Sequence, residues 1–118
     1  MDKTAVVKEL KFYLSNTDKI RFTSVYSSLI YAAKRYGLSG ATVYKGIMGY
    51  GASSNIVTSS FWEFTEKVPV VIEFIDNAEK ISGFIEKMRP WLEMLPKGCL
   101  VTCHDVDIVF SKRGNETK

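Results

Sequence analysis

Three closely spaced glycines stand where a predicted strand ends, and their backbone could bind an anion. They are Gly46, Gly49 and Gly51, with Tyr50 between the last two, and small polar residues follow them. Successive N–H groups in a glycine-rich turn form a concave nest that suits a phosphate group. The alternative is a hairpin loop in which glycine supplies positive φ angles. Residue types alone leave both interpretations open.

The same glycines do not fit two familiar motifs. A dinucleotide-binding fingerprint opens a helix within a βαβ unit, but residues 52–55 show no helical period. The segment 48–51 partly matches an RNA-recognition signature, which must continue as an aromatic-rich strand on which bases stack. Here small polar residues follow instead. We therefore expect neither a Rossmann site nor nucleic-acid binding.

A second group of reactive residues, Cys99, Cys103 and His104, lies near the C-terminus. A structural zinc site needs four Cys or His ligands, whereas the chain has two cysteines and one histidine. Neighbouring residues on a strand point to opposite faces, so Cys103 and His104 cannot share a metal ion without a bulge. We expect no metal site, and instead a core cysteine and a surface histidine.

The spacing of the two cysteines also bears on their redox state. Two residues four positions apart on one strand have Cα atoms about 13 Å apart. That separation is too large for a disulfide bond. We therefore expect reduced thiols, which suit a cytoplasmic protein.

The composition is that of one folded domain. The chain has 118 residues, of which 46% are hydrophobic and 25% charged, and its net charge of +3 is too small to indicate a nucleic-acid partner. The longest apolar stretch, 68–72, falls far short of the roughly 20 residues of a membrane span, and no apolar signal segment begins the chain. We expect a single domain over 1–118 with flexible ends at 1–7 and 112–118. No Ser–His–Asp set or close carboxylate pair indicates an enzyme.

Hydrophobic periodicity predicts the elements that would position these residues. Alternating apolar residues mark strands, and apolar residues at helical spacing mark helices. In chain order we expect strand 8–14, helix 25–36, strand 40–48, strand 69–75, helix 77–89 and strand 98–110. This β-α-β-β-α-β order predicts an α+β, ferredoxin-like fold, in which an antiparallel sheet carries both helices on one face.

Local signals mark several element ends. Thr23 or Ser24 can cap the first helix, and Gly37 can end it in the left-handed conformation. Asp76 and Glu79 are spaced as in a variant of the capping box, which places the start of the second helix just after Asp76.

Two positions interrupt the periodicity. Pro90 removes a backbone donor, so we expect the second helix to end at Arg89, with a kinked or separate turn from Pro90 to Leu95. In the last strand the apolar phase changes near His104 and Asp105, which a β-bulge would explain.

The strand over 69–75 is apolar on both faces. Three apolar residues alternate on one face, and on the other Val71 and Ile75 flank Glu73. A strand that is apolar on both faces is covered on both. In so small a chain the helices cover one face, so we expect another subunit to cover the other.

A long run between Ala32 and Gly51 is specific enough to suggest a family. It contains Gly-Leu-x-Gly-Ala-Thr-Val over 37–43, followed by the glycines described above, and further matching segments are 68–73 and 98–102. Together these segments resemble the PII-like family of bacterial and archaeal domains of unknown function. The chain also resembles PII signalling proteins, in which Gly-Phe-Gly stands at the base of a mobile T-loop.

The resemblance implies a homotrimer of ferredoxin-like subunits that requires no cofactor. It implies that an adenine nucleotide, ADP, ATP or AMP, binds in the clefts between subunits. It further implies that a T-loop-like loop over 49–64 couples this ligand to a partner such as a membrane transporter or channel. The protein would then be a cytoplasmic signalling regulator.

The resemblance also implies a set of nucleotide-binding residues. Backbone groups at two of the glycines would face the phosphates, a glutamate would lie near the cleft, and two cationic side chains would contact phosphate. The full set is Gly46, Gly49, Tyr50, Gly51, Glu73, Lys112 and Arg113. Two alternatives remain, a CutA-like trimeric metal-binding protein without nucleotide binding and a structural interaction module.

Overall fold

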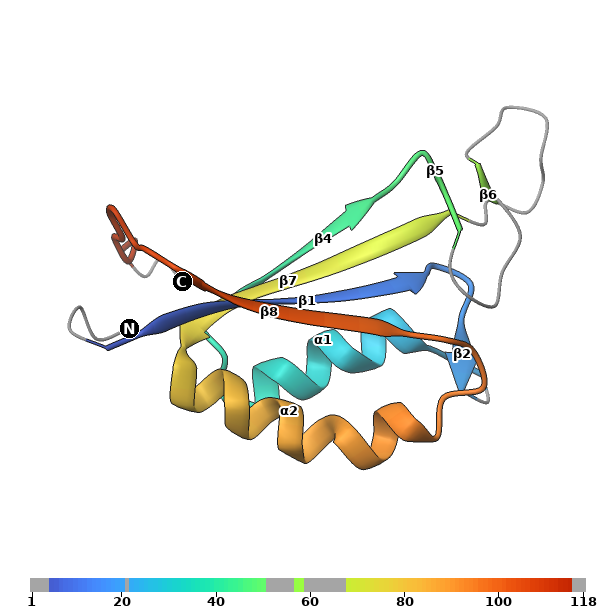
Figure 1. Ribbon diagram of the computed structural model, residues 1–118, viewed down its shortest axis with the longest axis horizontal. Helices are drawn as coiled ribbons and strands as arrows, with labels where there is room; N and C mark the ends of the chain where they lie inside the picture. Colours follow the sequence, from blue (N-terminus) through green and yellow to red (C-terminus); the bar gives the residue numbers. More distant parts are fainter. Residues whose placement is uncertain (1–4, 21, 51–56, 59–67, 116–118) are drawn as a thin grey trace.

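The computed structural model describes residues 5–20, 22–50, 57–58 and 68–115 (Figure 1). In chain order the elements are β1 (Val7–Ser15), β2 (Lys19–Ile20), β3 (Thr23–Ser24), α1 (Val25–Tyr36), β4 (Ala41–Lys45), β5 (Met48–Gly49), β6 (Val57–Thr58), β7 (Pro69–Asn77), α2 (Ala78–Glu93) and β8 (Leu100–Val106). Most of the predicted loop 49–64 lies outside the described residues, as do residues 1–4 and 116–118.

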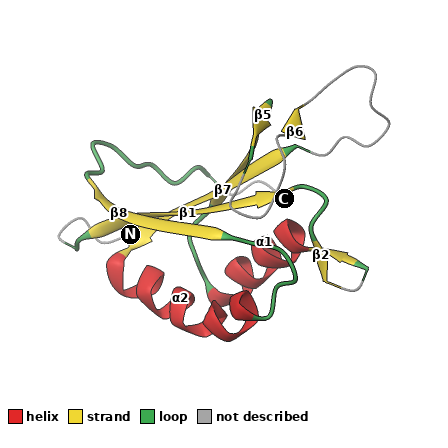
Figure 2. Cartoon of the chain, turned by 45° about the vertical axis from the view of Figure 1, so that its right-hand side comes forward, coloured by secondary structure: helices red, strands yellow, loops and turns green. Residues whose placement is uncertain are grey.

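Four long strands form one antiparallel sheet in the order β4-β7-β1-β8. Both helices cover the same face of this sheet and leave the other face open (Figures 1 and 2). Two short ribbons, β2 with β3 and β5 with β6, lie apart from it. The predicted α+β, ferredoxin-like arrangement is therefore confirmed.

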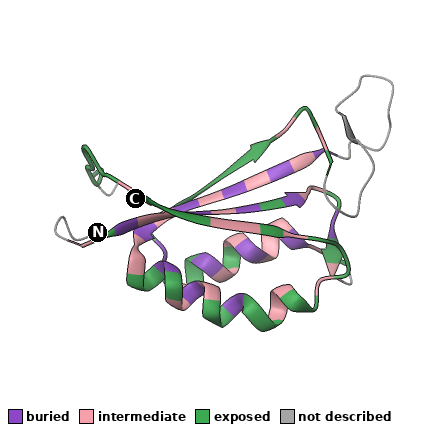
Figure 3. Ribbon diagram, in the orientation of Figure 1, coloured by how far each residue is buried: buried purple, intermediate pink, exposed green. Residues whose placement is uncertain are grey.

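The core lies between the sheet and the two helices (Figure 3). Strand residues of one parity, such as Leu10 and Phe12, are fully buried there. Phe74 packs edge-on against Phe12 and Phe84, with ring centroids 5.9 and 5.7 Å apart. These pairs join β1, β7 and α2 and hold the sheet against the helices.

Both predicted ends of α1 are confirmed. The Ser24 side chain accepts a hydrogen bond from the Ser27 N–H at 3.3 Å. Gly37 follows the helix with φ 107°, and its N–H donates to the carbonyls of Ala33 and Lys34. Short-range chemistry thus determines where α1 begins and ends.

The predicted ends of α2 are wrong. Asp76 belongs to β7 and does not cap the helix, whose N-cap is Asn77. The helix also continues through Pro90 to Glu93. Pro90 is exposed, and the turn that follows packs Trp91 and Leu92 partly against the core. This packing compensates for the backbone hydrogen bond that proline cannot make.

The predicted bulge in the last strand is also wrong. The pairing of β1 with β8 runs in unbroken register from Tyr13–Leu100 to Val7–Val106. The strand ends at Val106 and not at Phe110, because β1 begins at Val7 and offers no further partner. The apolar residues after Val106 that suggested a phase change lie beyond the strand.

The predicted strand 40–48 divides into two. β4 pairs with β7 from Ala41 to Lys45, and β5 pairs separately with β6. The division falls at Gly46, where the N–H donates to the Pro69 carbonyl at 2.7 Å. Within the described part of the chain, no helix has the length and apolarity needed to cross a membrane.

Candidate functional site

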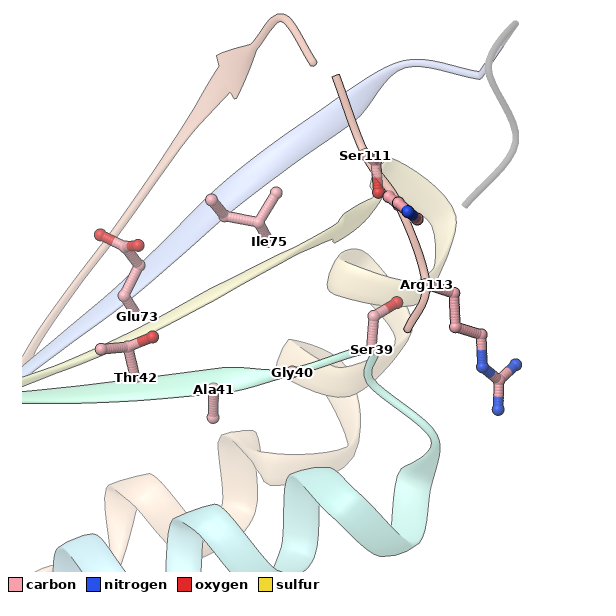
Figure 4. A pocket seen from close by; sticks show the side chains of 9 residues that line it. Ser39, Gly40, Ala41, Thr42, Glu73, Ile75, Ser111 and Arg113 are labelled. Atoms are coloured by element: carbon pink, nitrogen blue, oxygen red, sulfur yellow. The ribbon is translucent and has the colours of Figure 1, made fainter. Parts of the chain in front are cut away.

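A hollow of about 690 Å³ lies at one end of the sheet. It forms where the start of β4, the middle of β7 and the segment that follows β8 come together (Figure 4). Its lining residues are Ser39, Gly40, Ala41, Thr42, Glu73, Ile75, Ser111, Lys112 and Arg113. The structure thus joins three segments that are far apart in the sequence.

Three of the residues predicted for the nucleotide site line this hollow. They are Glu73 from β7 and Lys112 and Arg113 from the C-terminal segment. Thr42 is the direct partner of Glu73 in the β4–β7 ladder, so their side chains lie on the same, open face of the sheet. Sequence reasoning did not single out Thr42, although it stands within the family-like run.

The hollow carries positively charged side chains on one side and a negatively charged side chain on the other. Lys112 and Arg113 supply positive charge, and Glu73 supplies a carboxylate. Figure 4 shows the Arg113 guanidinium directed away from Glu73 and Thr42. A ligand that carries an anionic group and, some distance away, hydroxyl or amino donors would match this arrangement.

A buried carboxylate is hydrogen-bonded to one of the residues that line the hollow. Asp76 is 1% exposed, and its Oδ2 accepts hydrogen bonds from the Ser39 N–H and the Ser39 hydroxyl, each 2.8 Å long. Its Oδ1 accepts from the Asn77 N–H at 2.7 Å. Burial alone would raise the pKa of Asp76, but these hydrogen bonds, with the nearby Lys80, outweigh burial and lower it.

Sequence reasoning missed the role of Asp76 because the capping-box pattern explained it locally. A signal was nevertheless present. Asp76 has the same parity on β7 as the buried Ile72 and Phe74, so its carboxylate had to face the helix side of the sheet. A charged group at a core position requires partners.

Two of the predicted glycines, Gly46 and Gly49, lie elsewhere, beyond the far end of β4. Thr42 and Gly46 are four residues apart along this edge, which is about 13 Å at strand spacing. Tyr50 is 75% exposed, and Gly51 lies outside the described residues. Among the described residues of the predicted set, therefore, the hollow brings together Glu73, Lys112 and Arg113 but not Gly46, Gly49 or Tyr50.

Gly46 and Gly49 both pack against Pro69. A Cβ atom at position 46 would stand 2.7 Å from the Pro69 Cγ, and one at position 49 would stand 3.3 Å from it. Among the described glycines, positive φ occurs at Gly37. Gly46 and Gly49 therefore serve close packing here, and the hairpin interpretation based on positive φ does not apply to them.

The C-terminal cysteines and histidine do not converge. The register places Cys103 opposite Leu10 and His104 opposite Glu9, on opposite faces of β8. Cys103 is exposed, so the expectation of a core residue fits only Cys99, which is half-buried. Burial, with a contribution from the charge of Asp18, raises the pKa of Cys99 to about 11.

The described residues hold no metal-binding constellation of three or more His, Cys, Asp or Glu side chains. His104 Nε2 does lie 3.6 Å from Glu9 Oε1. Glu9 Oε1 also contacts Lys11 Nζ at 3.1 Å, so this carboxylate already has a cationic partner.

Comparison with known proteins gives a consistent result. The family model DUF190, described as an uncharacterized ACR, matches residues 7–108. A UPF0166 protein of Aquifex aeolicus is 32% identical over 103 residues, which are 87% of this chain and 93% of the relative. A UPF0166 protein of Methanocaldococcus jannaschii is 34% identical over 97 residues, 82% of this chain and 89% of the relative.

Two solved structures that share this fold are described as PII-like proteins. CPII from Thiomonas intermedia K12, described as a nitrogen regulatory PII-like protein bound to ADP, AMP and bicarbonate, superposes with a TM-score of 0.66 at 19% identity, covering 87% of this chain and 88% of CPII. A Thermus thermophilus protein described as a putative PII-like signaling protein gives a TM-score of 0.57 at 13% identity, covering 87% of this chain and 91% of that protein. The predicted PII-like fold is thereby confirmed.

Proposed function

The chain belongs to the DUF190 family, and on that premise we propose that it is a PII-like regulatory protein that binds an adenine nucleotide. The observation that carries this proposal is that Glu73, Lys112 and Arg113, which are far apart in the sequence, all line one hollow. ADP, ATP and AMP are the candidate effectors. The role is regulatory and not catalytic, and the protein acts in the cytoplasm.

The chemistry of the hollow suits a nucleotide. Phosphate is a strong acceptor that pairs with Lys112 and Arg113. The ribose hydroxyls and the adenine amino group are donors, which Glu73 and Thr42 can accept. Ile75, which also lines the hollow, supplies apolar surface for a base. The ADP and AMP bound to CPII show that a protein of this fold can hold such ligands.

An open sheet face supports the homotrimer. Tyr13 is paired with Val71 on one side and Leu100 on the other, and Val71 is paired in turn with Tyr44. These four side chains form one row across the whole sheet on the face that the helices leave uncovered. Tyr13, Tyr44 and Leu100 are 38%, 50% and 60% exposed in the single chain. A second subunit on this face would bury the row.

A trimer would also explain why the predicted site is divided. The hollow and the glycines at the far end of β4 belong to separate regions of one chain. In a cleft between subunits, the glycines of one copy would complete the hollow of the next. Phosphate would then lie between Lys112 and Arg113 of one subunit and the backbone near Gly49 of its neighbour.

The ligand would act through the loop over 49–64. If the ligand makes stronger contacts with one loop conformation than with another, it raises the population of the first. The size of this shift is set by the difference in binding free energy between the two conformations. A transporter or channel that recognises this conformation is the proposed partner.

Calorimetric titration with ATP, ADP and AMP tests the nucleotide site. We expect at least one of them to bind, and Lys112→Ala combined with Arg113→Ala to weaken binding about tenfold or more, since hydrogen bonds to charged groups contribute roughly 1.5–3 kcal/mol each. Lys97→Ala, an exposed cation outside the hollow, is the matched control. Absence of binding by all three nucleotides, or equal binding by both variants, would contradict the proposal.

A further inference from the structure

We propose that Asp76 is a positioning residue that holds the Ser39–Thr42 wall of the hollow in its binding geometry. This inference rests on the proposed function only in treating the hollow as the effector site. Asp76 itself does not line the hollow. It acts through Ser39, which does.

The contact is specific and fully formed. Both Ser39 donors, N–H and hydroxyl, converge on the single oxygen Oδ2 of Asp76 at 2.8 Å. The other oxygen is used by the Asn77 N–H at 2.7 Å. Asp76 is 1% exposed whereas Ser39 is exposed, so these hydrogen bonds tie a surface residue to a buried carboxylate. The three bonds therefore fix the carboxylate, and the carboxylate fixes Ser39.

A neighbouring contact holds the same connection. Lys80 Nζ, from the first turn of α2, donates to the Gly37 carbonyl at 3.0 Å. Gly37 and Ser39 both lie in the short connection between α1 and β4. Two side chains at the junction of β7 and α2 thus bind two points of this connection. Of the two contacts, the one to Ser39 is partly buried and the one to Gly37 is exposed.

The wall needs such a contact because β4 is an edge strand. It is hydrogen-bonded on one side only, to β7, and all five of its residues are exposed. The ladder begins at the Ala41–Phe74 pair, so Ser39 and Gly40 lie outside it. On the helix side of the same segment lies a second hollow of about 280 Å³, which also leaves it without packing there. Asp76 therefore holds this segment by hydrogen bonds to Ser39, where the sheet provides none.

Asp76→Asn tests this anchor with little change in shape. One amide oxygen can still accept, but the NH₂ group must now face backbone or hydroxyl donors, so at least one bond is lost. Ile81→Val is the matched control, because Ile81 is also fully buried near the start of α2 and belongs to the core, and neither isoleucine nor valine carries a polar side-chain atom that could accept from Ser39. It lowers global stability by a cavity effect alone.

The first measurement is hydrogen exchange across the chain. In Asp76→Asn, we expect exchange at 39–42 to rise about tenfold or more relative to the centre of β1, whereas Ile81→Val raises exchange without this local excess. The Ser39 amide proton provides a spectroscopic signature. Its NMR resonance should lie downfield in the wild type and in Ile81→Val, and should move upfield in Asp76→Asn. Equal exchange profiles in the two variants would overturn the proposal.

The second measurement is calorimetric titration with ADP. We expect Asp76→Asn to weaken binding about tenfold and Ile81→Val to leave it within about twofold. If the wild type binds ADP and Asp76→Asn binds it equally well, Asp76 is not a positioning residue. If the wild type binds no nucleotide, the proposed function fails, and the exchange profile and the Ser39 resonance still decide whether Asp76 holds the wall.

Discussion

Gly46 and Pro69 approach each other so closely that position 46 has no room for a side chain. The Gly46 N–H donates to the Pro69 carbonyl at 2.7 Å, and a Cβ at position 46 would stand 2.7 Å from the Pro69 Cγ. This contact closes the end of the β4–β7 ladder. It explains the glycine independently of any ligand.

Gly46→Ala should therefore destabilise the protein whether or not a nucleotide is present. Relieving the overlap requires a shift of the Pro69 ring or of the backbone, which typically costs about 1–3 kcal/mol. Gly40→Ala is the control, since its added methyl group meets nothing within 4 Å, and we expect it to be neutral or slightly stabilising. Urea unfolding measures both free energies. If Gly46→Ala had the same free energy of unfolding as the wild type, the contact between position 46 and Pro69 would not be tight.

The Asp76 carboxylate should make stability fall in acid. Its folded-state pKa is lowered, so it stabilises the fold above its unfolded-state pKa of about 3.9 and loses this contribution as pH falls through the lower folded value. Between pH 5 and pH 2 we expect the free energy of unfolding to fall more steeply for the wild type than for Asp76→Asn. Asp107→Asn, at an exposed aspartate, should retain the wild-type slope. If the free energy of unfolding depended on pH in the same way for the wild type and Asp76→Asn, the predicted role of the Asp76 pKa would be refuted.

The two cysteines should differ in reactivity. Cys103 is exposed, whereas Cys99 is half-buried with its pKa raised to about 11. Since the thiolate is the nucleophile, Cys99 should react with iodoacetamide at pH 8 roughly a hundredfold more slowly than an ordinary free thiol. Mass spectrometry of Cys103→Ser isolates the rate at Cys99, and Cys99→Ser isolates that at Cys103. In urea, where the protein is unfolded, both cysteines should react fast with iodoacetamide. Similar reaction rates at Cys99 and Cys103 in the native protein would contradict the prediction.

A charge on the open sheet face should dissociate the proposed trimer. Val71 lies at the centre of the row between Tyr13 and Tyr44. Val71→Lys would bury an unpaired ammonium group at the interface, so light scattering at micromolar concentration should report a monomer. Tyr31→Lys, at a 65% exposed residue of α1, is the control and should leave the mass unchanged. A wild-type monomer, or a Val71→Lys trimer, would rule out this interface.

Much of the fold was predictable because its signals are local or periodic. Alternation along β1 and β7, and the Ser24 and Gly37 caps of α1, act within a few residues. The predictions failed where distant packing outweighs local preference. Pro90 stays helical because core contacts of the following turn hold it, and β8 ends where β1 provides no further partner.

The sequence by itself determined the order of the four long strands and two helices, the two apolar faces of β7 and the family-like run that contains Thr42. It could not show that Glu73, Lys112 and Arg113 share one hollow and that Gly46 lies apart from it. Nor could it show that Asp76 serves Ser39 and not a helix end. The shared hollow and the Asp76–Ser39 contact join segments more than 30 residues apart, and only tertiary packing places such segments side by side.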